Sequence, residues 1–293
     1  MKKFLSIIVS ISFSSYALAY TSLRTVSESD LSGEFDELQS VHQALGIIQY
    51  QKTETKKDCT SGTCRIINEK ITDRFSGQTG FFIAPDLFVT AETPDEKKLF
   101  ACNGDTKTVI ATGLFHARLR QFKPQYRFKE CVVHEPRLGI AVIRVEGMDG
   151  NKAHHPVTLP IVPSNYTFGA TKLFSALGFS FEGRLFYSDQ CRPEHVDYSI
   201  PKGQQAKYPS IKLEKGAWSK LECLYRIGMA GSPILVRDGG QLVAAGIVST
   251  LTEQKGEVGE SGAFMYDLLA FPKLASIQAR LGMQLFGGEE TQK

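Results

Sequence analysis

Residues 79–91 of the chain have the sequence Thr-Gly-Phe-Phe-Ile-Ala-Pro-Asp-Leu-Phe-Val-Thr-Ala. Two runs of β-forming residues, 80–84 and 87–91, flank a Pro-Asp pair that is typical of a turn. We therefore expect two short strands joined by a turn at this point of the chain.

Similar short β-type runs occur along much of the remaining sequence. They lie at 108–115, 131–134, 140–145, 173–178, 184–188, 211–213, 234–237 and 242–249. Many short strands without intervening helices predict an all-β barrel or sandwich, and the two groups of runs indicate two similar units. Three prolines in and beside 157–165, which lies between the groups, are typical of a stiff connector.

Two segments further along the chain are considered together with residues 79–91. Residues 138–145 read Leu-Gly-Ile-Ala-Val-Ile-Arg-Val, and residues 228–233 read Gly-Met-Ala-Gly-Ser-Pro. Together the three segments resemble the chymotrypsin/trypsin-like serine proteases, and the last resembles the bacterial glutamyl-endopeptidase-like branch. The resemblance covers about residues 75–282. It implies two six-stranded antiparallel β-barrels with a C-terminal helix.

The side chains that catalyse peptide hydrolysis in this family are replaced. The chain continues Glu-Thr-Pro after residue 91, which places Thr93 where the family has its histidine. Gly139 matches the aspartate that orients the histidine, and Ala230 matches the nucleophilic serine. A methyl group cannot attack a carbonyl carbon, so the sequence predicts a catalytically inactive homologue, a pseudoprotease.

Other parts of the family's site depend less on side chains. The oxyanion hole uses backbone N–H groups, which Gly228 and Ala230 still carry, although the same glycine turn also serves barrel packing. The resemblance places Leu224 at the base of the specificity pocket and Ser249 on the strand that lines the substrate channel. Without an acid at Leu224, we expect no preference for Arg or Lys.

Few residues are candidates for a relocated catalytic group. Ser232 matches an ordinary motif serine of the bacterial branch, and His134 is expected at the rim of the cleft. Glu92 neighbours the histidine position but does not perform acyl transfer without a nucleophile. His116, His154, His155 and His195 have no partner that the sequence identifies.

The ends of the chain have patterns of their own. Residues 1–19 combine two lysines, an apolar run and an Ala-Leu-Ala sequence, which predicts a signal peptide cleaved between Ala19 and Tyr20 and a periplasmic or secreted protein. Residues 20–74 read as an extension with one amphipathic helix over 31–45 that packs on the main domain, or else binds a partner or acts as a propeptide.

The main domain is expected at 75–282, with one barrel over about 75–155 and the other over about 165–272. Pro272, a helical period and Gly282 predict the C-terminal helix, and 283–293 form a tail.

The six cysteines predict disulfides because the chain is expected to be exported. Six cysteines allow 15 complete pairings, of which pairing between neighbours is the simplest. This gives Cys59–Cys64, Cys102–Cys131 and Cys191–Cys223. The spacing of cysteine and histidine does not favour zinc, and no other metal or cofactor is expected.

The function expected from these patterns is binding rather than catalysis. Loss of Lys2 and Lys3 with the signal peptide lowers the formal charge from +3 to +1, which argues against nucleic-acid or membrane binding. We expect an unidentified polypeptide partner, bound by a decoy, regulator or adaptor. The alternatives are an active serine endopeptidase with relocated residues and a structural envelope protein.

Overall fold

The computed structural model describes a β-rich protein in which every pairing between named strands is antiparallel. The all-β fold class is therefore confirmed. The residues that the structure describes are 22–59, 64–92, 102, 107–112, 124–147, 156–169, 171–180, 183–195, 197–200, 202, 213–250, 252–257, 264–268 and 271–276.

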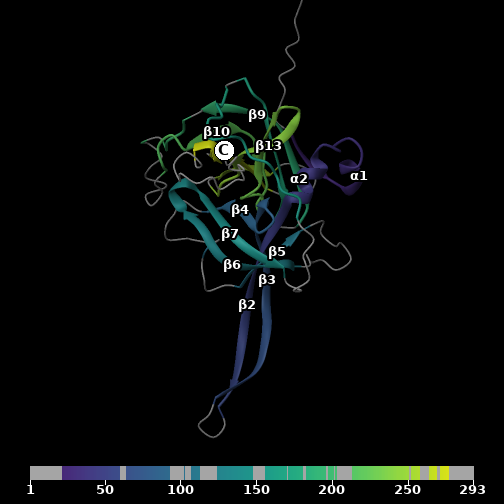
Figure 1. The fold of residues 1–293 in the computed structure, drawn as a ribbon, viewed down its shortest axis with the longest axis vertical. Coiled ribbons are helices and arrows are strands. Elements are labelled where there is room, and N and C mark those ends of the chain that lie inside the picture. Colours follow the sequence, from purple (N-terminus) through teal and green to yellow (C-terminus); the bar gives the residue numbers. More distant parts are fainter. Residues whose placement is uncertain are drawn as a thin grey trace, which may run out of the picture.

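The first half of the protein is a closed six-stranded barrel with the order β2-β3-β4-β7-β6-β5 (Figure 1). Its strands are β2 (Leu45–Asp58), β3 (Arg65–Ala84), β4 (Leu87–Ala91), β5 (Lys107–Thr112), β6 (Pro124–Glu135) and β7 (Ile140–Gly147). The predicted strand–turn–strand unit at 79–91 is the end of β3 followed by β4. Aromatic rings fill this barrel, where Phe82 lies 5.0 Å from the rings of both Phe88 and Tyr126.

The second half consists of a seven-stranded sheet and a three-stranded sheet (Figure 1). The larger sheet has the order β13-β12-β8-β9-β10-β16, with β1 paired to β9, and the smaller one has the order β11-β15-β14. Within the described residues these sheets do not close into the second six-stranded barrel that the resemblance implied.

The strands of the second half are shorter on average. They are β1 (Ser22–Val26), β8 (Phe174–Phe179), β9 (Leu185–His195), β10 (Trp218–Glu222), β11 (Leu224–Tyr225), β12 (Pro233–Asp238), β13 (Gln241–Ile247), β14 (Thr252–Glu257), β15 (Phe264–Leu268) and β16 (Phe271–Pro272).

The N-terminal region differs from the predicted extension. Instead of one helix over 31–45, the chain forms α1 (Glu28–Leu31), turns, and α2 (Leu38–Ala44), because β2 already begins at Leu45. β2 belongs to the first barrel, so the predicted start of the main domain at residue 75 was too late. The apolar residues expected to pack on the main domain, including Leu31 and Leu38, are nevertheless buried.

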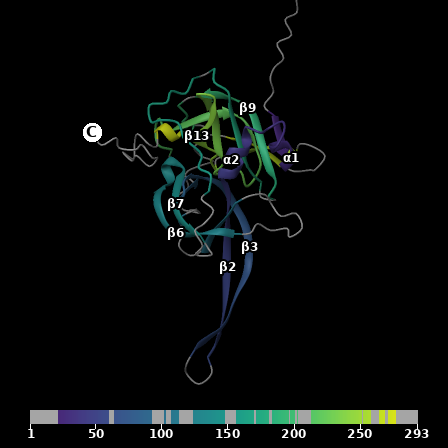
Figure 2. The same cartoon turned by 45° about the vertical axis from the view of Figure 1, so that its right-hand side comes forward.

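A long two-stranded ribbon, formed by the outer parts of β2 and β3, projects from the first barrel (Figures 1 and 2). The pairing of β2 with β3 continues, with three register shifts, as far as Asp58 and Arg65, and the Cys59–Cys64 disulfide follows at its end. The sequence patterns did not predict this ribbon.

All three predicted disulfides are confirmed: Cys59–Cys64, Cys102–Cys131 and Cys191–Cys223. The Cys102–Cys131 bond joins two segments of the first half, and the Cys191–Cys223 bond joins two segments of the second half. At the C-terminus a helical turn follows Lys273, and the rest of the predicted helix lies outside the described residues, as do the predicted signal peptide and tail.

The largest apolar cluster is shared by the two halves. It contains Phe81 and Val142 from the first barrel, together with Leu177 and Leu235 from the larger sheet of the second half. A site between the halves is consequently held on two sides by a common core.

Candidate functional site

The segments that carry the resemblance meet where the two halves touch. The N–H of Glu92 donates to the carbonyl of Gly139 at 3.0 Å, so the end of β4 lies beside the residue before β7. The N–H of Thr79 on β3 donates to the carbonyl of Gly228 at 3.0 Å, which brings the glycine turn of the second half to the same barrel. The histidine position, Thr93, follows Glu92 and lies outside the described residues.

Gly139, the predicted aspartate position, follows the 3₁₀ turn η2 (Pro136–Leu138) with φ of +66°. This left-handed conformation favours glycine over residues with a Cβ. A Cβ at Gly139 would also lie 2.5 Å from Cη2 of Trp218. The space for an orienting carboxylate is therefore occupied by an indole ring.

Trp218, the only tryptophan of the chain, is fixed in this place by burial and by a hydrogen bond. It begins β10, its side chain is fully buried, and its Nε1–H donates to the carbonyl of Arg137 at 3.0 Å. Sequence reasoning missed this residue, because its contact with Gly139 joins positions far apart in the chain.

The turn at 228–232, which contains the predicted nucleophile position, is held tightly against the first barrel. Gly231 has φ of +90°, and a Cβ there would meet the carbonyl of Thr79 and lie 2.5 Å from Oγ1 of Thr90. The N–H of Gly231 donates to the carbonyl of Val248 at 2.7 Å. The glycine turn thus has a packing role in this protein. This role was one of the two that the sequence predicted for it, and the other was the oxyanion hole.

The two N–H groups expected in the oxyanion hole lie in the same turn. Among the residues that the structure describes, no acceptor receives the N–H of Gly228 or of Ala230. Gly228 has φ of +98°, and its carbonyl accepts from Thr79, both from the N–H and from Oγ1 at 2.9 Å. This carbonyl is accordingly directed toward the barrel rather than toward a ligand.

Ser232, two residues beyond Ala230, is fully buried. Its Oγ has no hydrogen-bond partner among the described groups, and its side chain lies so close to Gly178 that a Cβ on this glycine would collide with it. This hydroxyl is therefore enclosed in the interior of the protein.

The two cleft positions differ in burial. Leu224, expected at the base of the specificity pocket, is half-buried in β11, where it pairs with Asp267 of β15. Ser249, just after β13, is fully buried. Beside Leu224, Tyr225 is enclosed, and burial raises the pKa of its hydroxyl.

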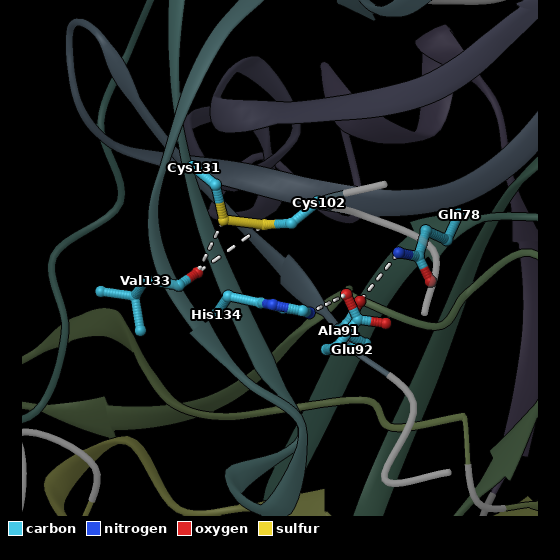
Figure 3. Close-up of a disulfide and its surroundings, with 7 residues drawn as sticks. All are labelled: Gln78, Ala91, Glu92, Cys102, Cys131, Val133 and His134. Carbon is cyan, nitrogen blue, oxygen red and sulfur yellow. Dashed lines mark hydrogen bonds and ion pairs between the residues drawn. A yellow bond between two sulfur atoms is a disulfide. The ribbon is translucent and has the colours of Figure 1, made fainter. Parts of the chain in front are cut away.

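A buried acid lies close to a histidine at the other side of the site (Figure 3). The carboxylate of Glu92 is fully buried, and its Oε2 lies 3.4 Å from Nε2 of His134 on β6. The His134 side chain is 31% exposed, which fits its predicted place at a rim. Sequence reasoning had noted both residues without predicting that they form a pair.

The Cys102–Cys131 disulfide lies near this pair (Figure 3). Cys131 precedes His134 on β6, and the two sulfurs lie 3.4 and 3.9 Å from the carbonyl oxygen of Val133. Gln78 also fixes the end of β4, because its Nε2–H donates to the carbonyl of Ala91 at 2.8 Å. The Glu92 side chain is therefore positioned by the strand that precedes it.

An exposed apolar side chain adjoins the glycine turn. Ile227, directly before Gly228, is 55% exposed, whereas Met229, directly after Gly228, is fully buried. Large apolar side chains with this exposure are few among the described residues, and the others are Val157 and Leu173. No sequence motif distinguished Ile227.

Within the described part of the chain, no group of His, Cys, Asp and Glu is arranged to hold a metal ion. None of the described helices has the length and apolar character needed to cross a membrane.

The fold is that of the trypsin-like serine proteases, as a comparison with solved structures shows. The HtrA-type protease AlgW with decapeptide superimposes with a TM-score of 0.50 and 13% sequence identity, over 88% of this chain and 67% of that chain. At this identity the likeness defines the fold alone. No family model matches the chain, and no curated protein matches its sequence.

Proposed function

We propose that this protein is an exported, trypsin-like serine protease homologue without peptidase activity that binds a polypeptide beside its degenerate centre. The term degenerate centre denotes Thr93, Gly139 and Ala230. The observation that carries the proposal is the indole of Trp218 in the space beside Gly139, because it leaves no room for the carboxylate that a serine protease needs.

The residue types at the degenerate centre also oppose catalysis. Serine, histidine and aspartate act as one unit, and loss of one member removes most of the rate. Here Ala230 has no nucleophilic atom, and the enclosed Ser232 does not replace it. The Glu92–His134 pair is the observation that favours an active enzyme with relocated residues, but an acid and a base alone lack a nucleophile for acyl transfer.

Groups in and beside the turn at 228–232 support polypeptide binding. The N–H groups of Gly228 and Ala230 are available donors within the described structure, and Ile227 presents an apolar side chain next to them. Backbone donors and one apolar contact are the elements with which extended peptides are recognised. The similar solved protease carries a decapeptide, which supports the same class of ligand here.

Export is supported by the three disulfides, since such bonds persist in oxidising compartments and are rare in the cytosol. The sequence of residues 1–19 supports it independently. A structural envelope protein is the third possibility, and it would show no soluble ligand.

The test uses fluorescently labelled, unfolded casein as both ligand and substrate, together with a serine-directed fluorophosphonate. We expect casein to bind without cleavage, and we expect neither the wild type nor Ala230→Ser to be labelled. The triple variant Thr93→His, Gly139→Asp and Ala230→Ser is also expected to stay unlabelled, because Trp218 excludes the new carboxylate. Stoichiometric labelling of the wild type, or cleavage that increases with its purity, would contradict the proposal.

Two exposed apolar residues provide a matched pair for locating the binding surface. Ile227→Asp is expected to weaken casein binding about tenfold, because a charge replaces an apolar contact worth one to two kcal/mol, roughly. Leu173→Asp, which changes a similarly exposed side chain before β8, should leave binding unchanged. Equal effects of the two variants would place the binding surface elsewhere, and no binding at all would favour the structural role.

A further inference from the structure

The ribbon of β2 and β3 extends beyond the strand that accompanies it at the barrel. Among the described residues, β5 pairs with β2 from Gly46 to Gln51, whereas the pairing of β2 with β3 continues to Asp58. Figures 1 and 2 show this outer part projecting away from the other described segments. A two-stranded ribbon is marginally stable in water on its own, so its stability gains from additional strands.

The two edges of the ribbon differ in regularity. At three places in the pairing β3 advances by one residue more than β2, between Ile47 and Gln49, Lys52 and Thr53, and Lys56 and Lys57 of β2. Thr72 and Ile67 are two of the extra residues, both on β3. Such bulges disrupt the outer edge of the strand that carries them and protect it from pairing. β2 has no extra residue between 52 and 58, and its outer edge is therefore the regular one.

Within the described part of the chain, β2 has an unpaired edge of limited length. It begins after Gln51, where β5 takes the edge, and ends before Cys59, where the disulfide closes the hairpin. The stretch 52–58 is Lys-Thr-Glu-Thr-Lys-Lys-Asp, and its central residue is Thr55. Two such edges, placed antiparallel and related by a twofold axis, fit each other fully only when the axis passes through Thr55.

We propose that β2 pairs with β2 of a second copy of this chain, antiparallel and centred on Thr55, to form a continuous four-stranded sheet. In this register Lys52 lies opposite Asp58 of the other copy, and Glu54 lies opposite Lys56. Each opposite-charge pair occurs twice because the interface is isologous. Cross-strand pairs of opposite charge stabilise a sheet, and like charges directly opposite destabilise it.

The charges also exclude the neighbouring symmetric registers. Centring the axis on Glu54 places Lys52 opposite Lys56, and centring it on Lys56 places Glu54 opposite Asp58. Lysines on an edge often prevent pairing altogether. In this chain their order relative to the acids favours one register, which coincides with the middle of the free edge.

Crosslinking tests the register directly. In the proposed dimer the two copies of residue 55 face each other at a Cα separation of about 5 Å, within the reach of a disulfide. Thr55→Cys is therefore expected to form a covalent dimer on mild oxidation. Thr53→Cys is the matched control on the same face of the strand, because its two copies are separated by about four residues, or ~13 Å, and should not crosslink.

Charge exchange tests the pairing without a new thiol. Lys56→Glu places two acids opposite each other at two symmetric positions and is expected to raise the dimer dissociation constant about tenfold. The double change Glu54→Lys and Lys56→Glu restores opposite charges and should return the constant to the wild-type value. Sedimentation equilibrium of the purified protein measures both, and mass spectrometry checks that the native disulfides are retained.

Two results would overturn the proposal. The first is a wild type that stays monomeric up to about 100 µM, a concentration at which even a weak specific dimer is populated. The second is a dimer whose dissociation constant does not respond to Lys56→Glu, or which crosslinks equally through residues 53 and 55.

Discussion

The first-barrel side of the proposed degenerate centre is closed, whereas the second-half side carries a glycine turn with positive φ angles. On the first side Trp218 fills the space beside Gly139 and Glu92 is fully buried. On the second side Gly228 and Gly231 retain positive φ, and two N–H groups lack an acceptor among the described residues.

Under the proposed function, this difference separates positions that serve only the reaction from positions that also hold the fold together. A side chain that only takes part in chemistry can be replaced and its space refilled. The turn at 228–232 also holds the two halves together through Thr79, so its glycines remain under a structural requirement. The backbone arrangement would then survive whether or not it still binds a ligand.

The largest effect is expected from a double-mutant cycle at the closed side. Trp218→Ala should lower the free energy of unfolding by about 3 to 5 kcal/mol, because a fully buried indole is removed. Gly139→Asp should cost about 3 kcal/mol through backbone strain and collision with the ring. Urea denaturation measures each variant.

The combined variant decides whether the two effects are linked. In the Trp218→Ala background the ring is gone, so Gly139→Asp should cost at least about 1 kcal/mol less than it does in the wild type. Strict additivity would show that the indole does not limit the aspartate position.

The next largest loss of stability is expected from a substitution in the turn at 228–232. Gly231→Ala should destabilise the protein by about 3 kcal/mol, because the new Cβ meets the backbone of Thr79 at a positive φ. Gly240 has nearly the same φ, +89° against +90°, with nothing within 4 Å of a Cβ. Gly240→Ala should therefore cost only about 1 kcal/mol of backbone strain, as measured by thermal and urea unfolding. Similar losses at both sites would mean that φ alone explains the glycines.

The smallest changes in stability are expected when either of two buried hydroxyls is removed. The two changes should differ in sign or size. Oγ1 of Thr79 accepts from the N–H of Phe179 at 3.0 Å, so Thr79→Val should cost about 1 to 3 kcal/mol in free energy of unfolding. The hydroxyl of Tyr225 has no hydrogen-bond partner among the described groups, so Tyr225→Phe should be neutral or stabilise by up to about 1 kcal/mol. A loss of stability at Tyr225 would reveal a polar partner for its hydroxyl.

Local patterns in the sequence were sufficient for the fold class and for the disulfides. The alternation of short apolar runs and turns predicted strands such as β4, and neighbour pairing was correct for Cys191–Cys223. The extent of the N-terminal helix was wrong, because Leu45 satisfies a helical period but pairs with Phe81 in the barrel. Tertiary pairing overrode the local pattern there.

The candidate site was predictable in its residue types but not in its contacts. Ala230 and Gly139 are visible as replacements in the sequence, and their positions rest on the resemblance. The indole beside Gly139 and the pair of Glu92 with His134 join residues from different strands, and no periodicity encodes such distances. The ribbon was missed because its polar, charged sequence resembles a loop.

The first strand of the protein has a consequence for how the chain folds. β1 pairs with β9, with Val26 opposite Leu185, so the strand synthesised first has its partner far along the chain. Pairings of such large sequence separation form late and slow the folding of a β protein. We expect β1 to remain without its partner strand until β9 has been made, which makes the earliest part of the described chain one of the last to acquire its native structure.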